Sequence, residues 1–166
     1  WDYILYTSID ANGDDCYWTW GVYPEEGTHS PTATYLWGLA PENDDWLVSP
    51  ALYLEKGKDY TMRCAVRGEA DEYAGKISAW VGTAADTTAL STQIMKSQDV
   101  DYTEEKYLHS DPFQVKESGL YHVGLHIGGA RTHFYIYVSE LHVTETPVGV
   151  EHVGTTLAEI TQQNGM

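Results

Sequence analysis

Basic residues are scarce in this chain. Nine lysines and arginines stand against 25 aspartates and glutamates, and the formal net charge of the 166 residues is −16. Binding to a nucleic-acid backbone or to an anionic membrane surface needs clusters of lysine and arginine, and the sequence has none. Apolar runs of the length of a membrane-spanning helix are also missing. We therefore expect neither a nucleic-acid partner nor insertion into a membrane.

Cysteine is limited to Cys16 and Cys64. Two cysteines are too few for a disulfide framework, and their separation fits no zinc-binding pattern. One disulfide and two inert thiols both remain open. Cys64 alternates with Met62 and Val66 on one face of a predicted strand, so we expect it to be buried. Cys16 directly follows a turn, and we expect it to be the more accessible thiol.

Catalytic motifs are absent as well. The chain has no Gly-x-Ser-x-Gly nucleophile elbow, no glycine-rich phosphate loop and no His-Glu-x-x-His pair. We expect a protein that is not an enzyme. His122 and His126 alternate on one predicted strand and would bind a transition metal if His133 lay across the ladder. The alternative is that they are polar residues on a solvated sheet face.

Strand patterns fill the chain instead. Apolar and aromatic residues alternate between turn clusters, and Pro50 places a bend in one segment; a looser stretch at 83–95 allows a helical turn after Ala84. The predicted strands are 1–9, 16–23, 32–39, 45–54, 59–67, 76–82, 107–115, 119–127 and 132–143. This count and spacing predict an all-β, jelly-roll β-sandwich of two antiparallel sheets. The core is expected to include Trp46, Val66, Ile77, Val81, Val123, Leu125, Ile136 and Val138.

The sequence predicts one domain over residues 1–143. Residues 144–150 have the composition of a linker, and 155–165 fit a short helix with a capping box at Thr156 and Glu159 and a stop at Gly165. We expect 144–166 to be a linker with this short helix, leading to a further region. A docked appendage is the alternative.

Thirteen tyrosines and six tryptophans stand against two phenylalanines. Tyrosine and tryptophan are favoured at positions where an aromatic ring is partly exposed to water, as at binding surfaces. Trp18, Trp20, Tyr35 and Trp37 lie on predicted strands on either side of the loop 24–31, where a hairpin would make Trp20 a cross-strand neighbour of Tyr35 or Trp37. We predict these four residues as a ligand-binding platform for a sugar. A buried aromatic cluster is the alternative.

Three oxygen-bearing residues alternate in the first turn cluster: Asp10, Asn12 and Asp14, around Gly13. Such a tight loop aims oxygens at one point and favours calcium. The twelfth residue from Asp10 is Gly21 rather than glutamate, so the loop is not an EF-hand, and further oxygens must come from elsewhere. The alternative is an ordinary turn.

Three segments in order resemble a known family: Ile9–Trp18, Asp44–Leu54 and Phe134–Val143, with Ser118–His126 between the last two. Together they are similar to the cleaved-adhesin domains in the haemagglutinin regions of gingipain-type proteases. They are equally similar to the related MAM-like β-sandwich modules of bacterial surface proteins. The resemblance spans roughly residues 1–143.

The resemblance implies a jelly roll with loops pinned by calcium. It adds Asp45, from the stretch before Trp46, to the candidate metal ligands; the alternative is a solvated entry to the strand. It also adds Glu140, at the place where the family carries a pair of acids on its final strand; Ser139 stands in the other place. The predicted metal set is Asp10, Asn12, Asp14, Asp45 and Glu140.

The resemblance also implies a function. It predicts a non-catalytic adhesin or carbohydrate-binding module in a secreted or cell-surface protein of several domains. The expected partners are a glycan or a host surface protein, together with the other domains of the parent chain. The alternatives are a structural spacer with no ligand of its own, and a haem- or haemoprotein-binding module that uses His122 and His126.

Overall fold

The computed structural model describes residues 6–22, 31–35, 41–72, 74–131 and 135–146. This part of the chain contains eleven strands and no helix, hence none long and apolar enough to cross a membrane. One sheet holds β1 (Thr7–Asp10), β4 (Glu42–Val48), β5 (Leu52–Leu54), β7 (Gly75–Gly82), β8 (Thr92–Val100) and β10 (Gly119–Ala130). The other holds β2 (Trp18–Val22), β3 (Pro31–Tyr35), β6 (Tyr60–Gly68), β9 (Lys106–His109) and β11 (Ile136–Glu145).

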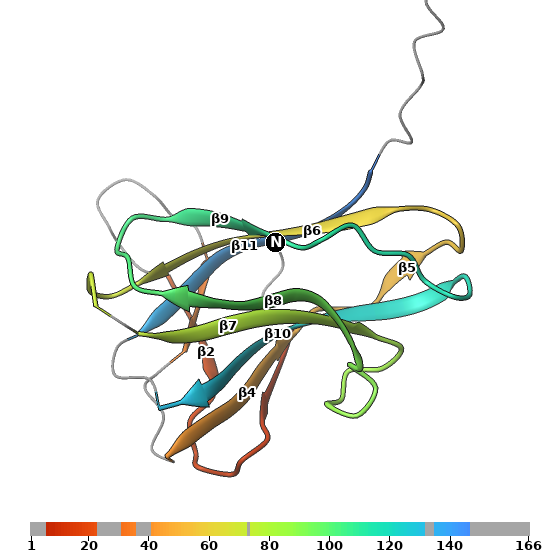
Figure 1. Cartoon of the computed structure of the whole chain (residues 1–166). Helices are drawn as coiled ribbons and strands as arrows, with labels where there is room; N and C mark the ends of the chain where they lie inside the picture. Colours follow the sequence, from red (N-terminus) through yellow and green to blue (C-terminus); the bar gives the residue numbers. More distant parts are fainter. Residues whose placement is uncertain (1–5, 23–30, 36–40, 73, 132–134, 147–166) are drawn as a thin grey trace, which may run out of the picture.

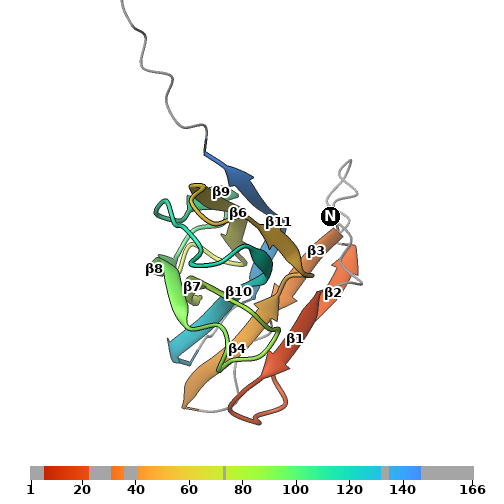
Figure 2. The same cartoon turned by 90° about the vertical axis from the view of Figure 1, so that its right-hand side faces the viewer.

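The two sheets pack as layers. The six-stranded sheet has the order β1-β4-β10-β7-β8, with β5 also paired to β10, and the five-stranded sheet has the order β2-β3-β11-β6-β9. All pairings are antiparallel. Figure 1 shows β9, β6 and β11 in one layer, with β8, β7, β10 and β4 in the other. Figure 2 shows β1 and β4 at one edge of the sandwich. The prediction of a sandwich of two antiparallel sheets is confirmed.

Alternation of apolar residues builds the core between the layers. Side chains two residues apart on a strand point to the same face, and the predicted inward sets of β6, β7 and β10 are buried, apart from the half-buried Tyr121 of β10. Every residue predicted for the core is at most 7 % exposed. The core between the sheets contains all of them except Trp46, namely Val66, Ile77, Val81, Val123, Leu125, Ile136 and Val138; Trp46 is buried in a separate cluster with Val48 and Leu90.

The predicted bend at Pro50 separates two strands that pair with the same partner. β4 pairs with β10 at residues 124–130, and β5 pairs with it at 119–121. Ser49 closes the gap between them, because its backbone N–H donates to the carbonyl of Val123 and its Oγ accepts from the N–H of Val123. The interruption therefore leaves β10 paired along its length.

Two local expectations are wrong in part. The stretch predicted as loose, 83–95, is irregular as far as Ser91 and holds a turn at Asp86–Ala89, where the N–H of Leu90 donates to the carbonyl of Asp86; β8 then begins at Thr92 and continues to Val100. Two register shifts against β7, between Ile77 and Trp80, place extra residues on β8. These bulges break the alternation of apolar residues by which β8 could have been predicted. The strand predicted at 107–115 ends as β9 at His109, and only a single bridge from Phe113 to Tyr60 follows.

The last strand runs slightly past the predicted domain end at residue 143. β11 continues to Glu145, and the N–H of Thr146 donates to the carbonyl of Asp59. The helix predicted at 155–165 lies outside the described residues.

Candidate functional site

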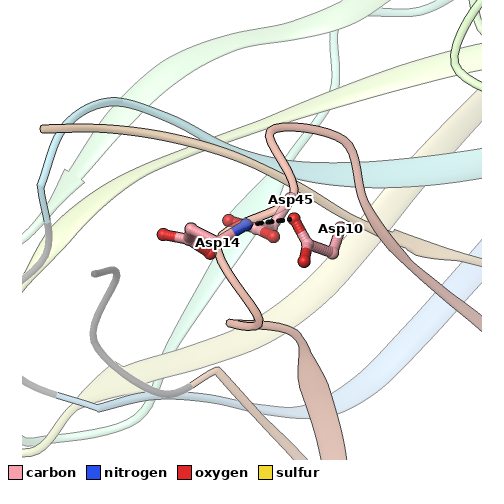
Figure 3. A group of neighbouring side chains, drawn as sticks. All are labelled: Asp10, Asp14 and Asp45. Atoms are coloured by element: carbon pink, nitrogen blue, oxygen red, sulfur yellow. Dashed lines mark hydrogen bonds between the residues drawn. The ribbon is translucent and has the colours of Figure 1, made fainter. Parts of the chain in front are cut away.

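Three carboxylates converge where the chain passes from one sheet to the other. Asp10 ends β1, Asp45 stands opposite it on β4, and Asp14 lies in the loop that leads to β2 of the other sheet. One oxygen from each lies within 4.8 Å of the other two. Figure 3 shows the three side chains meeting beside this loop. Asp45 is 0 % exposed, so one of the three charges is fully buried.

The loop is shaped around the Asp10 carboxylate. Oδ1 accepts the backbone N–H groups of Gly13 at 2.6 Å and Asp14 at 3.2 Å, and Oδ2 accepts that of Asp15 at 2.9 Å. Gly13 and Asp15 both take the left-handed conformation, with φ of 70° and 63°. This tight winding brings three amides to one carboxylate. It also turns Asp14 back toward Asp10 and Asp45.

The donor set fits a hard cation such as calcium. Two like charges within 4.8 Å of each other repel by at least about 3 kcal/mol at an effective dielectric constant near 20. A divalent cation replaces that repulsion with attraction, and calcium takes carboxylate and amide oxygens as ligands. Each carboxylate offers about four lone-pair sites, and Asp10 uses three of them for amides, so one acceptor site remains, on Oδ2. The arrangement therefore suits a calcium ion.

The other two predicted metal ligands differ in their placement. Asn12 lies in the loop, where its Oδ1 accepts the N–H of Asp14 at 3.3 Å and its Nδ2 donates to the carbonyl of Glu42 at 2.8 Å. Glu140 is a correction: it lies on β11 of the five-stranded sheet and binds Arg63 at 3.1 Å. Among the described residues, the acidic group that could hold a metal does not include it.

The predicted sugar platform also needs correction. Trp18 is 1 % exposed and belongs to the core between the sheets, so it offers no face to a sugar. The β2–β3 register places Trp18 opposite Tyr35 and Trp20 opposite Ala33, rather than pairing Trp20 with Tyr35. The side chains of Trp20 and Tyr35, and all of Trp37, lie outside the described residues.

A different aromatic group lies on the outer face of the six-stranded sheet. We name Trp46, Trp80 and His126 the aromatic layer; they come from β4, β7 and β10. The Trp46 and His126 rings stack with centroids 4.2 Å apart and an interplanar angle of 23°, and Trp80 tilts against Trp46 at 6.1 Å. The register explains this meeting, because His126 stands opposite Trp46 on one side and Ser78 on the other.

Polar groups fix and border the aromatic layer. Asp44 Oδ1 accepts both Trp46 Nε1–H at 3.1 Å and His126 Nε2–H at 2.9 Å, while Trp80 Nε1–H donates to Ser78 Oγ at 3.1 Å. Burial lowers the pKa of His126, and the Asp44 carboxylate opposes this shift without cancelling it. The Asp44 side chain is 52 % exposed, so an acid stands at the open edge of the layer.

Gly124 and the loop residue Leu90 determine how closely groups pack on this outer face of the six-stranded sheet. A Cβ on Gly124 would stand 2.7 Å from Leu90 Cδ1 and 3.0 Å from Trp46 Cε3. The missing side chain at position 124 therefore lets both groups lie close to the sheet. Leu90 packs with Trp46 and Val48 from the turn above and covers that part of the layer. The part left accessible is formed by Asp44, His126 and the half-buried Trp80.

Part of this arrangement was predicted from the sequence. Its alternation placed His122 and His126 opposite the core face of β10, and the structure has them there. Trp80 was not singled out, although the inward set Ile77, Ala79 and Val81 already assigned it to the outer face. The metal alternative for the histidines is not tested, because its third ligand, His133, lies outside the described residues; His122 Nδ1 lies 2.7 Å from the carbonyl of Ser49.

Both cysteines are buried and free. The prediction for Cys64 is confirmed at 0 % exposure, and burial raises the pKa of its thiol to about 12. Cys16 is the more exposed of the two thiols, as predicted, but at 5 % it is also buried. The chain turns directly from the carboxylate loop into the core, where Cys16 packs with the buried cluster.

No protein-family model matches the sequence, and no curated protein matches it either. Solved structures do share the fold. The K1 cleaved adhesin domain of Lys-gingipain from Porphyromonas gingivalis W83 is similar with a TM-score of 0.65 and 17 % identity over 86 % of this chain and 91 % of that domain. The K2 domain of the same protease gives 0.63 and 15 % over 85 % and 90 %.

Carbohydrate-binding modules have the same fold. The CBM22-1 xylan-binding domain of Xyn10C from Paenibacillus barcinonensis is similar with a TM-score of 0.57 and 10 % identity, over 84 % of this chain and 85 % of that domain. The likeness to cleaved adhesin domains expected from the sequence is thus confirmed at the level of the fold.

Proposed function

We propose that this chain is a non-catalytic, glycan-binding module of a secreted or cell-surface protein with several domains. The observation that carries the proposal is the aromatic layer, with Asp44 at its edge. A pyranose ring stacks on flat aromatic surface, and its hydroxyl groups bond to neighbouring acids and amides. The accessible edge of this layer offers both chemistries. The fold, which adhesin domains and carbohydrate-binding modules share, supports this function.

Rigidity supports the same function. The accessible His126 ring is held by stacking on the buried Trp46 ring and by a hydrogen bond to Asp44. Rings that are ordered before binding lose little conformational entropy on contact with a ligand. The layer is therefore organised in advance, as a binding surface requires.

We further propose that calcium occupies the carboxylate group of Asp10, Asp14 and Asp45, as the chemistry of this donor set favours. The ion would tie the loop after β1 to β4, at the point where the chain passes to the other sheet. Its role would be structural, with no part in any reaction. Asn12, in the same loop, would orient Asp14 through the bond that its Oδ1 accepts.

The test is a screen of neutral oligosaccharides on an array, in calcium and in EDTA, followed by titration calorimetry on any sugar retained. Trp80→Ala should weaken binding by about five-fold or more, since loss of a stacked ring costs on the order of 1 to 3 kcal/mol. Tyr53→Ala is the matched control, because that ring is 64 % exposed on β5, outside the aromatic layer.

Two results would count against the proposal. Unchanged affinity in Trp80→Ala would remove the aromatic layer from the function. If a folded protein retained no sugar on the array, the structural-spacer alternative would be favoured instead.

A further inference from the structure

Three nitrogen-bearing side chains stand in one row across the five-stranded sheet. Arg63 of β6 is directly opposite His109 of β9 on one side and His142 of β11 on the other. Residues paired across antiparallel strands point to the same face, and these three alternate with buried neighbours, so the row faces outward. All three are exposed, with 45 % of the Arg63 side chain and 51 % of the His142 side chain accessible.

The next row along the strands adds an aromatic ring and an acid. Tyr107 and Glu140 stand on either side of Ala65, and Tyr107 is 48 % exposed. The Arg63 guanidinium lies over the Tyr107 ring, 4.7 Å from its centroid, and also binds Glu140 at 3.1 Å. His142 Nε2 lies 3.6 Å from the same Glu140 oxygen. The two rows together form a patch of donors, a ring and one competing acid.

We propose that this patch, formed by Arg63, His109, His142, Tyr107 and Glu140, binds an acidic polysaccharide through the carboxylate groups of its uronic-acid units. Arginine presents a planar fork of N–H donors that fits a carboxylate, and imidazole supplies a donor in either protonation state. Tyr107 offers an adjacent ring edge and face to the sugar. Glu140 orients Arg63 in the free chain, and a ligand carboxylate replaces Glu140 as the partner of the guanidinium when the polymer binds.

The charge balance selects this class of ligand. The patch pairs its one permanent cation, Arg63, with Glu140 in a chain with a net charge of −16, whereas a tight complex with nucleic acid takes many phosphate contacts. A polymer of uronic-acid units, each with one carboxylate beside neutral hydroxyl groups, suits one arginine flanked by uncharged donors. An acidic polypeptide has the charge but no pyranose face for Tyr107 to contact.

This site goes beyond the proposed function. It lies on the five-stranded sheet, and the aromatic layer lies on the outer face of the six-stranded sheet. Figure 1 shows β9, β6 and β11 in the layer away from β4 and β10. Failure of one site therefore says nothing about the other.

The test is binding of the intact chain to immobilised polygalacturonate, with the fully methyl-esterified polymer as the uncharged counterpart. The wild-type chain should bind the acid polymer and should not bind the esterified one. Arg63→Ala should weaken binding at least about ten-fold, because a hydrogen bond to a charged group is lost. Arg63→Lys should restore only part of it, since lysine lacks the fork. Glu140→Gln should strengthen binding a few-fold by removing the competing carboxylate.

Two matched variants make the result specific. Lys96→Ala removes one exposed cation from β8 on the other sheet and should leave binding unchanged. Trp80→Ala should also leave it unchanged, which separates this site from the aromatic layer. Melting curves for Arg63→Ala should stay close to wild type, because an exposed ion pair contributes little stability.

The proposal is overturned by any of three results. One is no binding to polygalacturonate by the folded wild type. Another is equal binding to the esterified polymer, which would show that the charge is not recognised. The third is equal or stronger binding to polyglutamate, which would identify an acidic polypeptide as the ligand class.

Discussion

His126 lies flat against Trp46, with ring centroids 4.2 Å apart, and both rings donate to the same oxygen of Asp44. The two residues are 80 positions apart in the sequence and meet because β4 and β10 pair with His126 opposite Trp46. A single carboxylate oxygen therefore sets the orientation of two rings. Substitutions at Asp44 or His126 should therefore lower the free energy of unfolding, because they loosen the packing on the outer face of the six-stranded sheet.

The first prediction concerns acid. Burial lowers the pKa of His126 below its ordinary value, so the unfolded chain takes up this proton more readily than the folded chain. The stability due to neutral His126 is then complete above about pH 6.5 and is lost as the pH falls below that value toward the folded pKa. Urea unfolding between pH 5 and pH 8 measures this slope.

His126→Gln should flatten the slope in that window, and His109→Gln, at an exposed position, should not. A free energy of unfolding that increases on acidification through pH 6.5 would contradict the assignment. An unchanged slope in His126→Gln would do the same.

The second prediction concerns calcium. An ion that binds only the folded chain adds about 2.7 kcal/mol at a hundred-fold excess over its dissociation constant. That energy corresponds to a rise in melting temperature of roughly 5 to 10 °C for a domain of this size. Asp10→Asn, Asp14→Asn and Asp45→Asn should each remove most of the rise, since each withdraws one of the grouped carboxylates.

Differential scanning calorimetry with calcium and with EDTA gives the measurement. Asp111→Asn is the control, at an exposed position away from the carboxylate group. If EDTA leaves the wild-type melting temperature where it was, the three aspartates serve only to shape the loop.

The third prediction concerns the thiols. Cys16 and Cys64 are buried and free, and the pKa of Cys64 is raised to about 12. Alkylation depends on the thiolate and on access, so neither should react with iodoacetamide in the native chain at pH 8. Both should be labelled after denaturation without reductant, as mass spectrometry would show. A denatured chain with neither cysteine labelled would mean a disulfide.

The fourth prediction concerns the turn that covers the aromatic layer. A Cβ on Gly82 would overlap the backbone of Ala89 and Leu90. Gly82→Ala should therefore lift the turn and cost about 1 to 3 kcal/mol in the free energy of unfolding. Gly119→Ala is the matched control, because its Cβ would meet nothing within 4 Å. Equal stability of the two variants in urea would show that the turn is not held against β7.

Local alternation determined much of this fold. Tyr60, Met62, Cys64 and Val66 could be assigned to one buried face from the sequence, because a strand has a period of two and one face must leave water. Alternation failed where the strand is irregular. Between Val138 and Leu141 the inward residues are three apart, and the structure has a bulge there that restores the inward face.

The sequence by itself determined the all-β class, the inward faces of the central strands and the carboxylate-rich loop after residue 10. The tertiary structure alone decided which of the outward and polar residues meet. It brought Asp45 to Asp10 and Asp14, excluded Glu140, buried Trp18 and placed His126 on Trp46. The physical reason is register: a strand's own pattern fixes which side each residue faces, but only pairing between distant strands fixes its neighbour.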